Sequence, residues 1–268
     1  EMKTYIGICA CVLGLMAPSM VDSKSAYLSR KAKGHILVSV VTPKGLKKLY
    51  GKDVKSQWSF WPASTIKIFP AISLVKWAKK QGLKKTDKIR YRRGRWWRTT
   101  TVDKMLHQIL VKSSNSVYDE AVRIVGLDQV NKDLAQMKLK KTWLSQAYSR
   151  GGSLKRGLLV MIPGKIWESK RARKKSSWCR SNCTSFLDLQ KGLIKAHAEP
   201  WIRPHLKRAK SMFRFVLRRE LGKRLAIYNK DGITKYDTIG NALFVYKGKT
   251  YLMTCSVKTE RKKRWSRK

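Results

Sequence analysis

Acidic residues are scarce in this chain of 268 residues. Only 16 Asp and Glu stand against 61 Lys and Arg, so the formal net charge is +45. A field of that sign attracts polyanions with an affinity that falls steeply with salt. The segment Arg90–Arg98 interleaves cations with indoles, which could stack bases. The basic residues are spread over the whole chain, however, and accompany no recognised nucleic-acid motif. We therefore expect anionic envelope polymers as partners, and no specific nucleic acid.

Histidine and cysteine are few, and neither is spaced to bind a metal. No metal-ligand spacing links the four histidines, which are His35, His107, His197 and His205. Cys179 and Cys183 are four residues apart, but no histidine or second cysteine pair lies near them in the sequence. We expect no metal and no cofactor. In an oxidising compartment Cys179 and Cys183 could pair across a tight loop, which would leave Cys255 free in a strand.

The sequence has no apolar run that comfortably forms a transmembrane helix, which needs about 20 residues. Tyr5–Ala17 is apolar but shorter, and it follows the single cation Lys3. Small residues suited to a cleavage site come next, so residues 1–25 are predicted to be a signal peptide. After cleavage no transmembrane anchor is expected to remain. We expect the mature protein to be monomeric and either periplasmic or secreted.

No internal repeat or low-complexity linker divides the rest of the chain. Residues 26–268 can bury one substantial core, so we expect a single domain. A helix is predicted over residues 22–33. Residues 35–53 and 225–257 are rich in strand formers, and the stretch between them is mostly helical in pattern.

The most informative motif is Ser64-Thr-Ile-Lys67, at the start of an apolar helical stretch. Residues three apart on a helix share a face, so the lysine amine can lie beside the serine hydroxyl. If burial and nearby cations keep the amine partly neutral, it can take the proton from the serine. The pattern alone is weak, because Ser73-Leu-Val-Lys76 matches it too.

Two further motifs follow along the chain. Ser113-Ser-Asn115 is the only Ser-x-Asn in the sequence, and it ends a stretch from Val102 whose apolar residues have helical spacing. Lys230-Asp-Gly232 enters an extended stretch that continues to Val245. A Ser or Asn at a helix corner is usually a cap, and Lys-x-Gly also occurs elsewhere. The ordered set of three motifs is far more specific than any one of them.

This ordered set resembles the motifs of the penicillin-recognising serine enzymes, and among them the class A β-lactamases and their relatives. Pro62–Lys67 resembles the nucleophile motif, Lys112–Ser116 the Ser-Asp-Asn loop, and Asn229–Tyr246 the Lys-Thr-Gly strand with its successor. The resemblance implies an α/β (α+β) fold. Its antiparallel five-stranded sheet is flanked by an N-terminal helix and joined to a mostly helical subdomain. Residues 26–62 and 215–268 are then assigned to the sheet subdomain and residues 63–214 to the helical one.

The resemblance also implies roles for the residues that match. Ser64 would be the acylated nucleophile, Lys67 its base or a proton relay, and Ser113 the donor to the leaving nitrogen. The implied substrate-binding residues are Asn115, Lys230, Asp231, Gly232 and Ile233. Asn115 would hold the substrate amide, and Lys230 would face the substrate carboxylate and help lower the pKa of Lys67. The backbone N–H groups of Ser64 and Ile233 would form an oxyanion hole.

Two departures from the family pattern bear on mechanism. The glutamate that activates the deacylating water is missing, and its expected place is near Tyr148. Glu168 lies at about the right distance before Thr184, so it is the candidate base, with a solvated surface charge as the alternative. Asp231 replaces a Thr or Ser whose hydroxyl can donate to a substrate carboxylate, whereas an ionised aspartate can only accept. Either Asp231 points away and pairs with a cation, or the substrate is not a typical β-lactam.

The sequence therefore predicts an exported serine acyl-transfer hydrolase that forms a Ser64 acyl-enzyme with a β-lactam or a peptidoglycan-type amide. The leading interpretation is β-lactamase-like hydrolysis. One alternative is a penicillin-binding D,D-peptidase that is acylated and then deacylates slowly. Another is an inactive relative that binds cell-wall polymer or another polyanion.

Overall fold

The computed structural model describes residues 34–52, 59–149, 153–155, 157–173, 176, 178–179, 181–234 and 237–258. The predicted signal peptide (1–25) and N-terminal helix (22–33) lie outside these residues. Among the helices that are described, none has both the length and the apolar character needed to cross a lipid bilayer.

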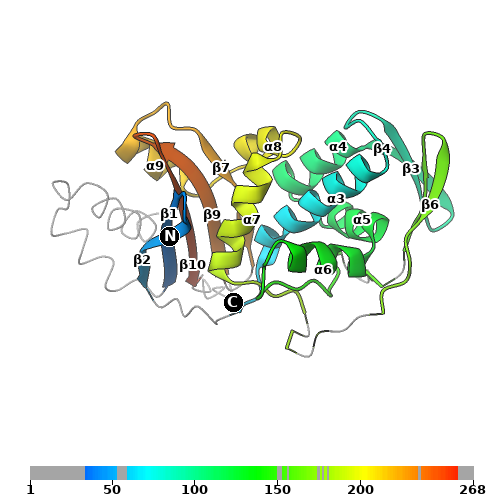
Figure 1. Ribbon diagram of the computed structural model, residues 1–268, viewed down its shortest axis with the longest axis horizontal. Helices are drawn as coiled ribbons and strands as arrows, with labels where there is room; N and C mark the ends of the chain where they lie inside the picture. Colours follow the sequence, from blue (N-terminus) through cyan, green and yellow to red (C-terminus); the bar gives the residue numbers. More distant parts are fainter. Residues whose placement is uncertain are drawn as a thin grey trace, which may run out of the picture.

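The main sheet is antiparallel and has six strands in the order β2-β1-β10-β9-β7, with β8 also paired to β9 (Figure 1). The strands are β1 (Gly34–Thr42), β2 (Gly45–Lys52), β7 (Ile227–Asn229), β8 (Gly232–Ile233), β9 (Asp237–Tyr246) and β10 (Lys249–Lys258). β7 and β8 both pair with the same edge of β9, one after the other. The sheet is therefore five strands wide, and its edge strand is interrupted. This confirms the predicted fold class. The interruption between β7 and β8 consists of Lys230 and Asp231.

Both faces of this sheet are buried, because alternate side chains of its central strands enter two different hydrophobic clusters. Leu252 of β10 belongs to the cluster shared with the helices, whereas its neighbour Met253 belongs to a smaller cluster on the other face. Successive side chains of a strand point to opposite faces, so a strand covered on both sides needs an apolar run. Helix α7 (Phe186–Ala198) covers the first face and α9 (Arg214–Leu221) the second. Figure 1 shows α7 between the sheet and the other helices.

Helix α3 (Ile68–Lys80) is the centre of the helical part. Its first eight residues, from Ile68 to Val75, are all buried, so the helix has little polar face. A helix that is apolar almost all round is one that other elements enclose. The enclosing elements include α7, α4 (Val102–Leu106), a π-helical turn η3 (His107–Val111), α5 (Asn115–Val125) and α6 (Leu127–Gln136), and α8 (Arg203–Arg208) packs against η3 and β7. The short 3-10 turn η2 (Ala63–Lys67) leads directly into α3.

A second sheet, of four strands in the order β4-β3-β5-β6, lies at the far end of the helical part (Figure 1). Its strands are β3 (Lys88–Arg93), β4 (Trp96–Thr101), β5 (Leu159–Ile162) and β6 (Lys165–Glu168). The sequence analysis expected mostly helix here and missed this sheet. Strand β3 does alternate, since the buried Ile89 and Tyr91 alternate with exposed basic residues, whereas β4 exposes both Trp96 and Trp97 and shows no apolar alternation. The cation–indole segment belongs to the β3–β4 hairpin, where Arg90 lies over the Trp97 ring at 5.6 Å.

Cys179 and Cys183 form a disulfide, the pairing that the sequence made possible but did not decide. Cys255 has a free thiol and is buried on β10. The backbone of Cys183 pairs with Trp143. The next residue, Thr184, pairs with Phe60, with N···O distances of 2.8 and 3.0 Å. The disulfide loop is therefore hydrogen-bonded to the chain segment that leads into η2.

The charge imbalance predicts that salt stabilises the fold. Sixteen carboxylates cannot neutralise 61 basic side chains, so the folded chain repels itself, and added ions screen this repulsion. We expect the unfolding midpoint to rise by about 5 °C between about 20 mM and about 500 mM NaCl, which corresponds to roughly 2 kcal/mol for a chain of this size. Thermal melts followed by circular dichroism measure it. An unchanged or lower midpoint at high salt would contradict the prediction.

Candidate active site

Ser64 lies in η2, directly after a residue with unusual backbone geometry. Ala63 has a φ of 48°, in the left-handed region that costs a non-glycine residue about 1–3 kcal/mol. The Tyr148 hydroxyl donates to the Ala63 carbonyl at 2.7 Å and so holds this conformation from outside the turn. Ser64 itself is partly buried. Such strained residues are typical of sites where the backbone must present a neighbouring group.

Lys67 closes the same turn and has no exposed surface. A 3-10 helix has about three residues per turn, so Ser64 and Lys67 lie on one side of η2. The Lys67 ammonium donates to the Ser113 carbonyl, to Asn115 Oδ1 at 2.6 Å and to Ser113 Oγ at 3.3 Å. All three acceptors belong to the second sequence motif.

Ser113 forms a sharp corner between η3 and α5. Its φ of 56° is also left-handed, and this conformation turns both its carbonyl and its hydroxyl toward Lys67. The next residue, Ser114, caps α5 by accepting from Val117 N at 3.3 Å, in the way expected of a serine at a helix N-terminus. At this corner Ser114 caps the start of α5, and Ser113 faces the site.

Lys230 brings the third motif to the same place. It lies in the break between β7 and β8 and is 4% exposed. Its ammonium donates to Ser113 Oγ at 2.9 Å and to the Asp231 carbonyl at 3.0 Å. The Ser113 hydroxyl thus accepts from two lysines. Three segments that are far apart in the sequence meet around the Ser113 side chain.

The electrostatics of the cluster favour a neutral amine on Lys67. Burial, and next the positive charge of Lys230, lower the pKa of Lys67 to about 7, although the carboxylate of Asp119 acts in the opposite direction. Burial also lowers the pKa of Lys230 to about 8, against the attraction of Asp231. Both amines are therefore able to exchange a proton near neutral pH.

Asp231 points away from the cluster, which was one of the two outcomes considered for it. Its carboxylate accepts from the backbone N–H of Met212 at 2.7 Å and of Asn241 at 3.3 Å. Its partners are backbone amides rather than the cationic side chain expected from the sequence. Burial raises the pKa of Asp231 to about 6, although these hydrogen bonds and the nearby cations lower it.

Gly232 allows β8 to approach the η2 turn that carries Ser64. A β-carbon on Gly232 would lie 2.7 Å from Ser64 N and 2.9 Å from Thr65 N. No side chain fits at those distances from a backbone, so the close contact requires glycine. The following residue, Ile233, has an exposed side chain (75%) at the end of this edge strand.

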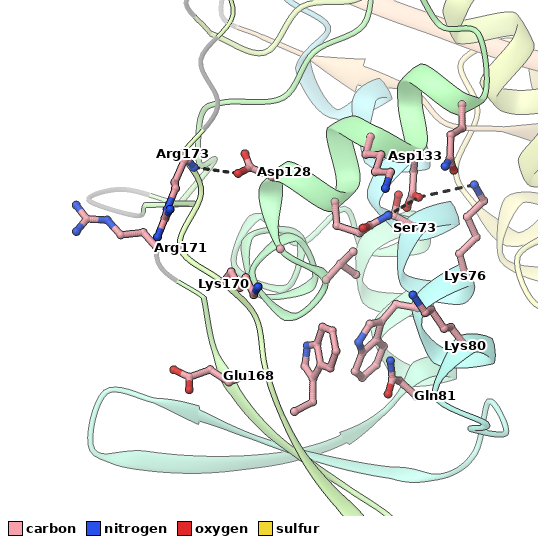
Figure 2. A pocket seen from close by; sticks show the side chains of 17 residues that line it. Ser73, Lys76, Lys80, Gln81, Asp128, Asp133, Glu168, Lys170, Arg171 and Arg173 are labelled. Carbon is pink, nitrogen blue, oxygen red and sulfur yellow. Dashed lines mark hydrogen bonds and ion pairs between the residues drawn. The ribbon is translucent and has the colours of Figure 1, made fainter.

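Glu168 is not part of the cluster, which corrects the proposed role in activating water. It is exposed in β6, where it pairs with Leu159 across the β5–β6 hairpin. It lines a separate hollow whose lining includes none of Ser64, Lys67, Ser113 and Lys230. Figure 2 shows its carboxylate on the outer side of the strand. The hairpin, which the sequence analysis missed, carries Glu168 away.

Tyr148 occupies the place where the sequence comparison expected a glutamate. Besides its bond to Ala63, its ring lies 5.7 Å from the Lys67 ammonium. The rings of Trp61 and Tyr118 pack on it at centroid distances of 5.7 and 4.9 Å. Burial raises the pKa of Tyr148 well above its usual value, so the phenol stays protonated.

Asp119 is a site residue that the sequence analysis missed. It is buried on α5, and its carboxylate accepts from the backbone N–H of Tyr148 at 2.8 Å and of Ser149 at 2.9 Å. It therefore fixes the segment that carries Tyr148 and adds a negative charge near Lys67. Only its position on the helix after the second motif could have suggested it.

The part of the chain that the structure describes contains no group of three or more His, Cys, Asp or Glu side chains placed to hold a metal ion. The groups that the cluster itself presents are two hydroxyls, two amines with lowered pKa values and the backbone N–H groups of η2 and β8.

The close contact at Gly232 yields a test of this geometry. Gly232→Ala should lower the free energy of unfolding by about 1–3 kcal/mol, because the new methyl group meets backbone that cannot move aside. Gly51→Ala is the control, since its nearest atoms belong to the flexible end of the Lys48 side chain. Urea denaturation of both variants measures the difference. Equal losses would mean that β8 does not press against η2.

No family model matches the sequence, and no curated protein does. Solved structures do match. A class A β-lactamase from Bacteroides cellulosilyticus has 14% identity and a TM-score of 0.61 over 87% of this chain and 86% of its own. A β-lactamase from Streptosporangium roseum has 13% identity and a TM-score of 0.63 over 87% of each chain. PBP-A has 14% identity and a TM-score of 0.58 over 86% of this chain and 83% of its own. At this level of identity the likeness concerns the fold alone: the chain has the fold of the class A β-lactamases and PBP-A.

Proposed function

We propose that the protein is a serine acyl-transfer enzyme, acylated at Ser64 by a β-lactam or a peptidoglycan-type amide. The observation that carries the proposal is the buried Lys67 amine. It has a pKa of about 7, lies one turn from Ser64 and is held by Ser113 and Asn115. A lysine in that state can act as a base near neutral pH, which an exposed lysine cannot do.

Acylation then runs as one proton relay. The neutral Lys67 amine takes the proton of the Ser64 hydroxyl while the oxygen attacks the carbonyl carbon. The backbone N–H groups of Ser64 and Ile233 stabilise the negative oxygen that forms, and each such donor is typically worth about 10²–10³ in rate. The carbon–nitrogen bond breaks as Ser113 donates its proton to the leaving nitrogen. Lys67 returns the proton to Ser113, with which it already shares a hydrogen bond at 3.3 Å.

Substrate binding falls to Asn115 and Lys230. Asn115 is exposed, and its Oδ1 accepts from Lys67, so its amide N–H₂ is the group able to hold a substrate carbonyl. Lys230 supplies positive charge for a substrate carboxylate. Asp231 adds no donor beside it, since its carboxylate is bound to the Met212 and Asn241 amides. Carboxylate recognition therefore depends on Lys230 more than in enzymes with a hydroxyl at this position.

Slow deacylation follows from Tyr148. A protonated phenol that donates to the Ala63 carbonyl cannot take a proton from water, and Glu168 is exposed on another sheet. Neither residue therefore supplies a carboxylate base to the acyl-enzyme, and the buried Asp119 carboxylate is occupied by the Tyr148 and Ser149 amides, so we expect the adduct to persist. Of the activities that the sequence left open, this supports the penicillin-binding, D,D-peptidase type over rapid β-lactam hydrolysis. The signal peptide predicted for residues 1–25 supports export across the cytoplasmic membrane, to the side on which peptidoglycan lies.

Intact-mass spectrometry after treatment with benzylpenicillin tests the proposal. The protein should gain the full mass of the drug, because attack opens the ring without losing a fragment, and the adduct should persist for hours. Ser64→Ala should abolish the adduct. The matched control is Ser73→Ala, which removes the serine of the second Ser-x-x-Lys match and should leave labelling intact.

Rapid hydrolysis of a chromogenic cephalosporin, lost in Glu168→Gln, would contradict slow deacylation and restore Glu168 as the base. An unlabelled protein, or labelling that survives in Ser64→Ala, would reject acylation at this serine and favour the inactive polymer-binding relative.

The pKa of Lys67 predicts the pH dependence of acylation. The amine must be neutral to act as a base, so the rate rises with pH through a midpoint near 7 and is about tenfold lower at pH 6 than at pH 8. Lys230→Met removes a positive charge that lowers the pKa of Lys67, so its midpoint should move to higher pH. Labelling rates at low penicillin concentration measure both profiles. A midpoint that does not move would show that the two amines are not coupled.

A further inference from the structure

The small sheet of β3, β4, β5 and β6 has a buried inner face and an exposed outer one. Ile89, Tyr91 and Val160 point inward and belong to the core shared with the helices. Successive side chains of a strand point to opposite faces, so Arg90 and Arg92 point outward, and both are exposed. Figure 1 shows this sheet at the far end of the helical part, away from the main sheet.

The strand register identifies the neighbours of these two arginines. Residues directly opposite each other in an antiparallel pair have their side chains on the same face. Met161 lies opposite Arg90, and Ile166 lies opposite Met161 on the next strand. Trp97 lies opposite Arg92 in the same way. We call the surface formed by Arg90, Arg92, Trp97, Met161 and Ile166 the outer face.

The outer face combines exposed apolar side chains with positive charge. Ile166 is 66% exposed, Trp97 39% and Met161 36%. Together with Trp96 at the end of the β3–β4 hairpin, they are four of the eleven large hydrophobic side chains that the described residues expose. The four strands contain six basic residues and one acid, Glu168. An apolar surface that is exposed among charged side chains marks an interaction site.

The chemistry of the outer face discriminates between possible partners. A second copy docked face to face would bring Arg90 and Arg92 against the same cations, and like charges repel. A soluble polyanion would pair with the guanidinium groups but would leave the aliphatic Met161 and Ile166 in water. An anionic bilayer accommodates both kinds of group. Its phosphates meet the arginines, and the boundary between headgroups and acyl chains takes up indole and aliphatic side chains.

We propose that the outer face docks on the surface of an anionic lipid bilayer, with Trp97, Met161 and Ile166 at the level of the headgroups and the two arginines on lipid phosphates. The Arg90 guanidinium lies 5.6 Å from the centre of the Trp97 ring, so a phosphate bound to it brings the indole to the headgroups. The main sheet lies at the other end of the molecule (Figure 1) and is not covered by this docking. The docking does not depend on the chemistry at Ser64.

Cosedimentation with lipid vesicles tests the docking through two double variants of unchanged charge. Trp97→Ser with Ile166→Ser removes an indole and an aliphatic chain from the outer face. The control is Phe215→Ser with Leu49→Ser, which removes an aromatic and an aliphatic side chain that are exposed on other elements, at 64% and 43%. On vesicles of phosphatidylcholine and phosphatidylglycerol, the first variant should bind at least about tenfold more weakly than the wild type, and the control less than about threefold more weakly.

A soluble polyanion separates docking on lipid from the general attraction of anions to a basic protein. A linear polyphosphate, measured by isothermal titration, should bind the wild type and both double variants equally, because the substitutions leave the charge unchanged. Vesicles of phosphatidylcholine alone should bind the wild type at least about tenfold more weakly than the anionic vesicles, because they offer no net charge to the arginines.

A fluorescent reporter locates the contact. Ile166→Cys, labelled with the polarity-sensitive dye nitrobenzoxadiazole, should brighten and shift its emission to shorter wavelength on anionic vesicles. The same label on Phe215→Cys should not respond. Cys179 and Cys183 are bonded to each other and Cys255 is buried, so the dye reacts with the introduced cysteine.

The unfolding midpoint reports whether each variant is folded, independently of lipid binding. Equal losses of vesicle binding in the two double variants would overturn the proposal. So would a polyphosphate affinity that falls together with vesicle binding, a label at position 166 that does not respond, or no binding of the wild type to the anionic vesicles.

Discussion

Two buried lysines directed at one serine hydroxyl are the constraint on which the rest of the site depends. Burying an ammonium is costly unless hydrogen bonds and a lowered pKa compensate. Here Ser113 provides a carbonyl and a hydroxyl to Lys67, and Asn115 provides a third acceptor. Lys230 shares the hydroxyl and adds the Asp231 carbonyl. The same arrangement gives both ammonium groups hydrogen-bond partners. It also lowers the pKa of Lys67 to about 7, so that a neutral amine is available to act on Ser64.

This convergence explains the unusual backbone around it. Ala63 and Ser113 both have left-handed φ angles, and each turns a group that the cluster needs. The surrounding contacts maintain these conformations. Tyr148 donates to the Ala63 carbonyl, and Asp119 fixes the segment that carries Tyr148. Asp231 ties β8 to the segment before α9 through the Met212 amide. The departures from the family motifs thus serve the scaffold of the site rather than its chemistry.

Local spacing was enough to predict part of this arrangement. Ser64 and Lys67 share a turn because they are three residues apart, and the ordered motifs placed Ser113 and Lys230 beside them. The sheet followed from apolar runs in β9 and β10. What failed depends on non-local contacts: the β3–β6 sheet joins short strands from residues 88–101 and 159–168, and its β5–β6 hairpin decides where Glu168 lies. The orientation of the Asp231 carboxylate, away from the cluster, depends on the backbone N–H groups of Met212, which no motif contains, and of Asn241 on the next strand.

The loop closed by Cys179 and Cys183 gives the fold a dependence on oxidative maturation. Its neighbouring backbone pairs with Trp143 and with Phe60, four residues before Ser64. A bond of this kind forms and persists in oxidising surroundings. In reducing surroundings the loop would lose its covalent closure. The backbone bridges of Cys183 with Trp143 and of Thr184 with Phe60 would then start from an open loop. The redox state of the compartment thus acts on the segment that leads to Ser64 without touching any group of the Lys67–Ser113–Lys230 cluster.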